Sequence, residues 1–160
     1  MLVSSQIQTD QEGRCFPQYT ALSFGGLDLL VNQSEVLSIE SCNNIDREYP
    51  LSGALGWLTV ENAKIPVYSL SDQLAVETTI SESKTICAIL KDENSCISLL
   101  CTDTGSFKQP IVKMLPMPQC MQLVSSPIES LCLCKNKAGP VISFVASPNS
   151  LFNYIIQYKH

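Results

Sequence analysis

Short apolar runs separated by polar links follow one another along most of the chain. The runs expected to form strands are 19–24, 27–31, 36–39, 54–60, 65–70, 85–90 and 96–102, with a further hairpin over 131–144. Short strands at regular intervals, with turn residues between them and little helical periodicity, are typical of sandwiches and small barrels. The sequence therefore predicts an all-β fold.

The stretch from Gly53 to Leu74 contains the clearest of these patterns, a tight β-hairpin. Its two apolar runs flank the polar link E-N-A-K, in which Asn62 can take the positive φ of a short turn. Pro66 has no N–H to donate to a ladder, which predicts a position on an edge or beside a bulge. The same asparagine and proline recur 74 residues later as Asn136 and Pro140. The chain is thus expected to contain two related β units.

Polar and proline-containing segments separate these units. Residues 1–17 are predicted to be a loose arm, and 76–84 the link between the units. Residues 108–127 contain four prolines, which favours an extended crossing segment over a helix. The expected subdomains are about 18–75 and about 85–147, with exchange of strands between them left open.

Two short helices are predicted, one at the link and one at the C-terminus. Ser69 or Ser71 is placed to cap a helix that ends near Leu74. The C-terminal segment 148–160 has apolar residues at spacings that fit a helix with one face on the body of the protein. Those apolar residues are Leu151, Phe152, Ile155 and Ile156.

Composition and charge narrow the class of protein. A hydrophobic content of 45% in 160 residues supplies a core and excludes a disordered chain. The net charge of −5 has no basic run to offset it, which argues against nucleic acid as a partner. No apolar stretch is long enough to span a bilayer, and the N-terminal residues show no secretory signal. The expectation is a cytoplasmic protein without membrane insertion.

Eight cysteines are expected to be free thiols, because a cytoplasmic compartment is reducing. Cys132 and Cys134 lie on one face of a predicted strand, an arrangement that offers two ligands to a soft metal. His160 is the single histidine and no C-x-x-C is present, so the usual zinc spacings are absent. Core packing is the favoured interpretation, with no metal and no cofactor. The cysteines placed in apolar runs are Cys87, Cys96, Cys101, Cys132 and Cys134.

The order of these elements resembles the CheW-like family over about residues 18–152. A strand and a glycine turn precede L-L-V-N-Q-S-E-V-L-S-I, a polar loop, and G-x-x-x-V-E-N-A-K-I-P-V-Y-S-L. C-I-S-L-L-C-T falls where the family has a strand of its second subdomain, and K-M-L-P-M-P where it has a proline-containing crossing. The positions that match the family's hairpin pattern are Gly56, Val60, Pro66, Val67 and Leu70.

The resemblance implies a fold of two five-stranded β-barrel subdomains packed side by side around a shared core. It also implies a non-catalytic adaptor that couples the cytoplasmic tip of a chemoreceptor to the regulatory domain of a CheA-type histidine kinase. The pathway would be flagellar chemotaxis or a pilus-type system that controls twitching motility.

Five residues are candidates for partner contact. Val36 and Ile39 recur on one strand face, where β-branched residues more often point inward. Trp57, the single tryptophan, is either an interface anchor or a core residue among apolar neighbours. Glu61 and Asn62 lie at a hairpin tip, which is either a contact or a solvated turn.

The chain departs from the family at the exposed positions of this hairpin. The asparagine, arginine and glycine of the family's turn are replaced by Thr59, Glu61 and Asn62, and the aspartate before the final leucine by Ser69. Glu61 in place of an arginine reverses the charge at that position. The alternative function is therefore a degenerate scaffold of the family that binds another protein partner.

The segment Asp103-Thr104-Gly105-Ser106 raises a more distant alternative, because D-T-G-S is the spelling of an aspartic-protease active-site loop. That chemistry needs two carboxylates that share a proton, which a dimer can supply. The apolar-apolar-Gly segment that packs beneath such a loop is missing, since Gly139 is the sole later glycine. A polar turn after a strand is the favoured interpretation.

Overall fold

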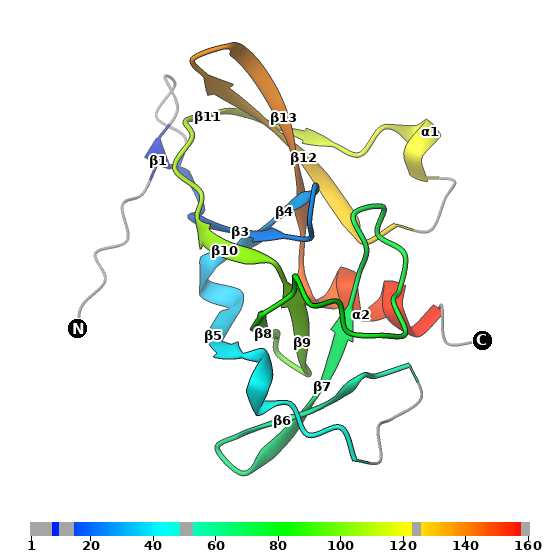
Figure 1. Ribbon diagram of the computed structural model, residues 1–160. Coiled ribbons are helices and arrows are strands. Elements are labelled where there is room, and N and C mark those ends of the chain that lie inside the picture. Colours follow the sequence, from blue (N-terminus) through cyan, green and yellow to red (C-terminus); the bar gives the residue numbers. More distant parts are fainter. Residues whose placement is uncertain (1–7, 10–14, 49–52, 123–125, 158–160) are drawn as a thin grey trace.

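The computed structural model describes residues 8–9, 15–48, 53–122 and 126–157 (Figure 1). The predicted arm at 1–17 lies largely outside these ranges, as do Pro50 and residues 158–160. In the described part of the arm, β1 (Gln8–Thr9) pairs antiparallel with β2 (Cys15–Phe16). The remaining strands form two sheets.

The first sheet, called sheet B, has six strands in the order β10-β3-β4-β13-β12-β11. All neighbours are antiparallel except β4 and β13, which run parallel. Its strands are β3 (Tyr19–Ser23), β4 (Asp28–Asn32), β10 (Asp103–Ser106), β11 (Ile111–Pro116), β12 (Ile128–Asn136) and β13 (Gly139–Ala146).

The second sheet, called sheet C, has five strands in the order β5-β8-β9-β7-β6. All neighbours are antiparallel except β9 and β7, which run parallel. Its strands are β5 (Val36–Ser41), β6 (Gly56–Val60), β7 (Ala63–Ser69), β8 (Ile86–Lys91) and β9 (Cys96–Cys101).

The two sheets share one topology, which confirms the predicted all-β fold of two related units. The series β10-β3-β4-β13-β12 has the same sequence of antiparallel and parallel pairings as β5-β8-β9-β7-β6. Each sheet combines a hairpin from the first half of the chain with one from the second half. Sheet B differs from the five strands expected by one extra edge strand, β11.

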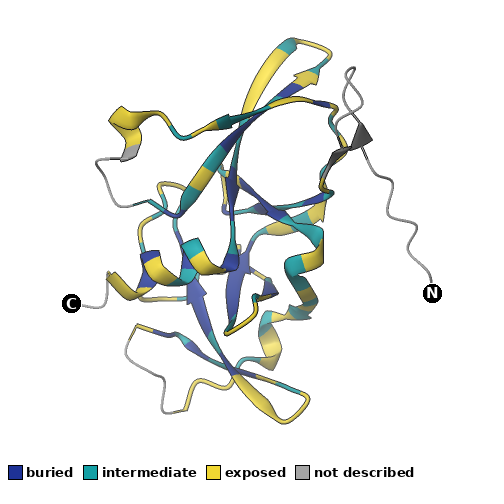
Figure 2. Ribbon diagram, turned by 180° about the vertical axis from the view of Figure 1, so that it is seen from behind, coloured by how far each residue is buried: buried dark blue, intermediate teal, exposed yellow. Residues whose placement is uncertain are grey.

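Three groups of buried side chains hold the fold together. The largest lies between the sheets and contains Leu22 and Leu29 of sheet B, Leu90 and Leu99 of sheet C, and Leu151 of the C-terminal helix. The buried residues of the two smaller groups come from single sheets, one group from sheet B and the other from sheet C. Figure 2 shows the buried residues concentrated in the centre of the molecule, with hairpin tips exposed. Because the largest group draws on both sheets, the two units share a core.

The C-terminal helix α2 (Pro148–Gln157) was predicted and begins with a reciprocal cap, in which the N–H of Ser150 donates to Oγ of Ser147 at 3.0 Å. Its buried face includes Leu151 and Ile155 as expected, but Tyr154 replaces Ile156, which is 40% exposed. The hydroxyl of Tyr154 donates to the carbonyl of Leu74, which explains how a tyrosine is buried at this position.

The other helical predictions need correction. Residues 71–74 form a turn in which the N–H of Leu74 donates to the carbonyl of Ser71 at 2.9 Å, not a short helix. Leu74 has a φ of 63°, which ends any helical path. Conversely, the proline-rich crossing contains one helical turn, α1 (Gln119–Gln122). Two 3-10 turns flank β5, η1 (Gln33–Glu35) and η2 (Cys42–Asn44).

Pro66 occupies a position that the sequence did not predict. It lies on β7, an internal strand of sheet C, opposite Trp57 of β6. The parallel ladder between β7 and β9 starts at Val67, so the missing N–H of Pro66 falls just before that ladder begins. An internal strand tolerates the proline here because no hydrogen bond to β9 is required of it.

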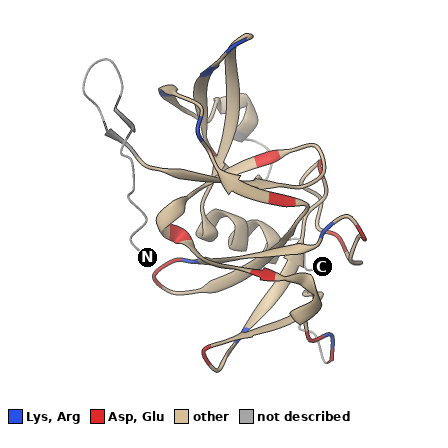
Figure 3. Cartoon of the chain, turned by 60° about the vertical axis from the view of Figure 1, so that its left-hand side comes forward, with Lys and Arg blue, Asp and Glu red and all other residues tan. Residues whose placement is uncertain are grey.

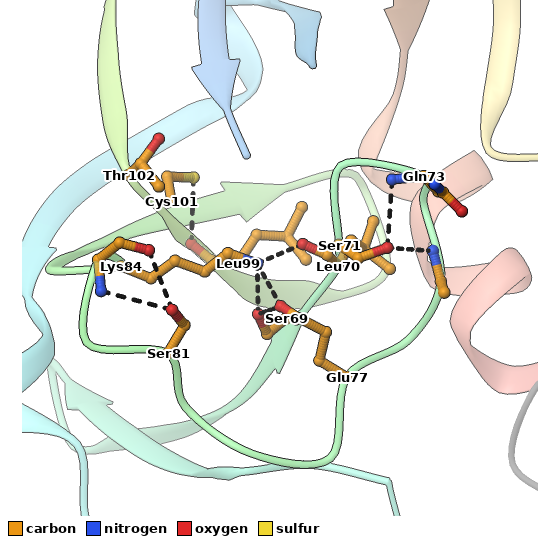
Figure 4. A network of polar contacts seen from close by, with 12 residues as sticks. Ser69, Leu70, Ser71, Gln73, Glu77, Ser81, Lys84, Leu99, Cys101 and Thr102 are labelled. Atoms are coloured by element: carbon orange, nitrogen blue, oxygen red, sulfur yellow. Dashed lines mark hydrogen bonds and ion pairs between the residues drawn. The ribbon is translucent and has the colours of Figure 1, made fainter. Parts of the chain in front are cut away.

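A buried lysine holds the 76–84 link, which joins β7 to β8 of sheet C (Figure 4). Lys84 is 4% exposed, and its Nζ donates to Oγ of Ser69 at 2.8 Å, to the carbonyl of Leu70 and to the carboxylate of Glu77. The ammonium also lies 5.7 Å from the ring centre of Phe24, in the turn between β3 and β4. The link is thereby tied to the end of β7 and to the turn between β3 and β4.

Candidate interaction surface

The edge strand β5 presents apolar side chains to solvent. Leu37 is 49% exposed and Ile39 44% exposed, although both lie on a strand of a well-packed sheet. A bulge between Val36 and Ser38 interrupts the ladder with β8. Large exposed apolar side chains on an open strand edge are features of binding surfaces and are otherwise a hazard for aggregation. The edge of β5 is therefore the first candidate for partner contact.

The bulge also explains the sequence prediction for this strand. Val36 lies opposite Leu90, and Ile39 lies opposite Ala88. Leu90 and Ala88 are two residues apart on β8, so Val36 and Ile39 lie on the same face of the sheet. Without the extra residue at Leu37, positions three apart would point to opposite faces. Val36 is half-buried against the central core, whereas Ile39 is exposed, so core and contact roles are divided between the two.

A shallow hollow of about 450 Å³ lies at the start of β5. Residues 34–37 and 91–93 line it, and its charged groups include Glu35, Asp92 and Glu93 beside the single cation Lys91. Burial, together with the charges of Glu129 and Asp92, raises the pKa of Glu35. The hollow thus combines excess negative charge with the apolar Leu37, a combination suited to a partner with basic and apolar groups.

The other predicted contact residues lie on the opposite edge of sheet C. Trp57 is half-buried on the edge strand β6, and its N–H and carbonyl pair with those of Asp46 at 2.7 and 2.8 Å. Glu61 and Asn62 are exposed and form the two-residue turn between β6 and β7. In the order of sheet C, strands β8, β9 and β7 stand between these residues and β5, whereas Trp57 pairs with Asp46 in the segment that follows β5.

The turn at Glu61 and Asn62 has an unusual backbone. Their φ values are 50° and 67°, the pattern of a type I′ turn. The positive φ of Asn62 was predicted, but that of Glu61 was not, because glutamate seldom adopts it. This tight turn fixes where the exposed Glu61 carboxylate projects, at the tip of the hairpin.

The segment Asp103–Ser106 does not form the loop of an aspartic protease, and it is not the turn that was favoured instead. It is the edge strand β10, paired antiparallel with β3 from Asp103 opposite Ser23 to Ser106 opposite Thr20. The carboxylate of Asp103 is exposed and accepts from the N–H of Thr104 at 2.8 Å. The apolar pattern of the sequence did not predict this strand, because its residues are small and polar.

Four of the five cysteines expected in the core are buried, whereas Cys96 is half-buried. Cys87, Cys101, Cys132 and Cys134 are buried free thiols, and burial raises the pKa of Cys101 to about 12. Within the described residues, no group of three or more histidine, cysteine or acidic side chains is arranged to hold a metal ion. In that same part of the chain, no helix is both long and apolar enough to cross a membrane.

The arrangement of two topologically equivalent, curled β-sheets around a shared core is the CheW-like fold. The crystal structure of the scaffolding protein TtCheW from Thermoanaerobacter tengcongensis is similar to this chain with a TM-score of 0.65. The match covers 85% of this chain and 92% of TtCheW, at 13% sequence identity. No protein-family model and no curated protein sequence matches the chain. The similarity between this chain and TtCheW is therefore a similarity of fold.

Proposed function

We propose that this chain is a cytoplasmic, non-catalytic adaptor of a bacterial chemosensory pathway. Two observations support the proposal, the overall similarity to a CheW scaffolding protein and the exposed apolar edge of β5. The proposed partners are the regulatory domain of a CheA-type histidine kinase and the cytoplasmic tip of a chemoreceptor. Both would be held by protein–protein contact, without a cofactor.

The observation that carries the proposal is the pair Leu37 and Ile39 on the outer strand of sheet C. A partner that binds an unpaired strand edge with exposed apolar side chains can form backbone hydrogen bonds and can also bury apolar surface. In the proposed function the acidic hollow at Glu35, Asp92 and Glu93 contributes orientation, because charge at the rim of an interface selects partners more than it adds affinity.

Co-purification tests this function. The wild-type protein is expected to retain the regulatory domain of a histidine kinase, or a receptor fragment, encoded by the same genome. Ile39→Lys should weaken retention about tenfold or more, because it places a charge in an apolar contact. Ile156→Lys is the matched control, since Ile156 is 40% exposed on α2, away from β5.

The alternative is a scaffold of the same fold that binds a different protein. It is motivated by Glu61, which carries a negative charge at the hairpin tip where the CheW-like pattern has an arginine. If neither a kinase domain nor a receptor fragment is retained by the folded wild-type protein, the adaptor function is contradicted and this alternative is favoured.

A further inference from the structure

The hairpin formed by β12 and β13 extends beyond the rest of sheet B (Figure 1). On one side β13 pairs with β12 from Gly139 to Ala146. On its other side, the parallel ladder with β4 contains Phe144 and Val145 alone. Among the described residues, no strand pairs with this side of β13 before Phe144. The first half of β13 is therefore an open strand edge inside a sheet.

The register shows which backbone groups face this open edge. The N–H of Lys135 donates to Pro110 at 3.0 Å, so the backbone of Lys135 points toward β11, away from β13. Its cross-strand neighbour Pro140 must then point its backbone outward, and so must Ile142 two residues later. The edge thus offers the carbonyl of Pro140 and both the N–H and carbonyl of Ile142. Pro140 loses nothing here, because its absent N–H would face solvent.

Apolar side chains accompany these backbone groups. Val141 is 36% exposed and Ile142 51% exposed, the latter being the largest exposure among the large apolar side chains of the described residues. Open backbone groups beside exposed apolar side chains are the requirements for binding an extended peptide as an added strand.

The charge around the hairpin is opposite to that of the whole chain. Lys108, Lys135 and Lys137 line a hollow of about 720 Å³ next to the hairpin tip, where Asp103 is the one acidic lining residue. Figure 3 shows the cations on this projecting hairpin and most of the acidic residues on other parts of the molecule. A protein with a net charge of −5 therefore presents a local basic surface. Such a surface favours an acidic partner.

We propose that the open edge of β13, from Pro140 to Ser143, binds an extended acidic segment of a partner protein as an added strand. Backbone hydrogen bonds to Pro140 and Ile142 set its register, and the three lysines at the hollow select its acidic side chains. A second copy of this chain is a poor occupant, because edge-to-edge pairing would bring two sets of lysines together. This surface is distinct from β5, which belongs to the other sheet.

The test uses a short synthetic peptide of alternating glutamate and valine, with a matched peptide that carries lysine in place of glutamate. The acidic peptide is expected to bind the full chain saturably, with affinity that falls as salt rises. In wild-type protein, hydrogen exchange of the Ile142 amide should slow on addition of the acidic peptide. The lysine peptide should produce neither effect.

Variants separate the contributions of backbone and charge. Ile142→Pro removes the outward N–H and should abolish binding, whereas Ile142→Val keeps it and should bind as wild type does. Lys135→Glu with Lys137→Glu should weaken the acidic peptide about tenfold. Lys64→Glu is the control for charge, because Lys64 is exposed on the hairpin of the other sheet.

Three outcomes overturn the proposal: no saturable binding of the acidic peptide, equal binding of the lysine peptide, or binding without protection of the Ile142 amide. Dimerisation of the wild-type chain that Ile142→Pro disrupts would assign the edge to a second copy and would also overturn it. Because the readout is the β13 edge, failure here is distinguishable from failure of kinase binding at β5.

Discussion

At the scale of single residues, the most constrained group is the Lys84 ammonium. A buried cation is costly unless it is paired, and here a carboxylate, a hydroxyl and a carbonyl surround it. Oγ of Ser69 also donates to Glu77 at 2.7 Å. Ser69 and Glu77 therefore hydrogen-bond both to the ammonium and to each other.

The Glu77 carboxylate is expected to make stability depend on pH. Burial favours its neutral form, but hydrogen bonds from Lys84 and Ser69 and the charge of Lys84 outweigh burial and hold the pKa below its usual 4.5. A lowered folded-state pKa stabilises the protein above the unfolded-state pKa. The contribution is therefore present at neutral pH and is lost as the pH falls from about 4.5 through the folded-state pKa.

Glu77→Gln should accordingly destabilise the protein by about 1 kcal/mol at pH 7, because the charge-assisted bond is lost while an amide oxygen can still accept. Denaturant unfolding at pH 7 and at low pH measures the difference, which should shrink as wild-type Glu77 is protonated. Glu82→Gln, at an exposed position of the same link, is the control and should have little effect. A difference that is constant with pH would contradict this account.

Some residue-scale features could be predicted from the sequence and others could not. The positive φ of Asn62 follows from residue type, because asparagine tolerates that region. The positive φ of Glu61 does not, since it is imposed by the two-residue connection between β6 and β7. The burial of Lys84 was equally invisible, because its partners Ser69 and Leu70 are distant in sequence and meet it through the fold.

At the scale of elements, sheet C curls until its edge strand β6 meets the segment that follows β5. Asp46 pairs with Trp57 there, and Gly56 allows the approach. A Cβ at Gly56 would lie 2.5 Å from the carbonyl oxygen of Asp46 and 2.6 Å from Cγ2 of Ile45. A glycine at this position is thus required by the close passage of another backbone.

Gly56→Ala should therefore destabilise the protein by about 1–3 kcal/mol, because the backbone at Asp46 must move to relieve the overlap. Thermal unfolding measures the loss. Gly105→Ala on β10 is the control, since a Cβ there would meet nothing within 4 Å. If the two variants are equally stable, the backbone at Asp46 does not pack closely against Gly56, and the proposed overlap is contradicted.

Hairpins were the elements best predicted from sequence, because apolar runs and turn residues that are close in the sequence are enough to indicate them. The strand β10 was missed, since its exposed residues carry no apolar pattern and its pairing with β3 comes from distant sequence. The prediction of a short helix near Leu74 was wrong for the opposite reason. Local capping signals were present, but Ser71 uses its Oγ to accept from the N–H groups of Gln73 and Ala75 in a turn.

At the scale of the whole molecule, each sheet is completed by a hairpin from the other half of the chain. Hairpin β3–β4 joins the later strands β12 and β13, while β8–β9 joins the earlier β6 and β7. Strand periodicity does not specify such distant partners, so residue patterns predicted two units but left their exchange open. For the same reason, the sequence did not show that β5 and β6, which carry the candidate contact residues, are the two edge strands of one curled sheet.

We propose that the β5 edge binds the regulatory domain of a histidine kinase. The most direct measurement is a titration of isotopically labelled protein with that domain, followed by amide NMR. We expect saturable shifts centred on Leu37 and Ile39, which Ile39→Lys suppresses and Ile156→Lys preserves. Absence of binding by the folded wild-type protein, or shifts that leave β5 unaffected, would contradict the claim.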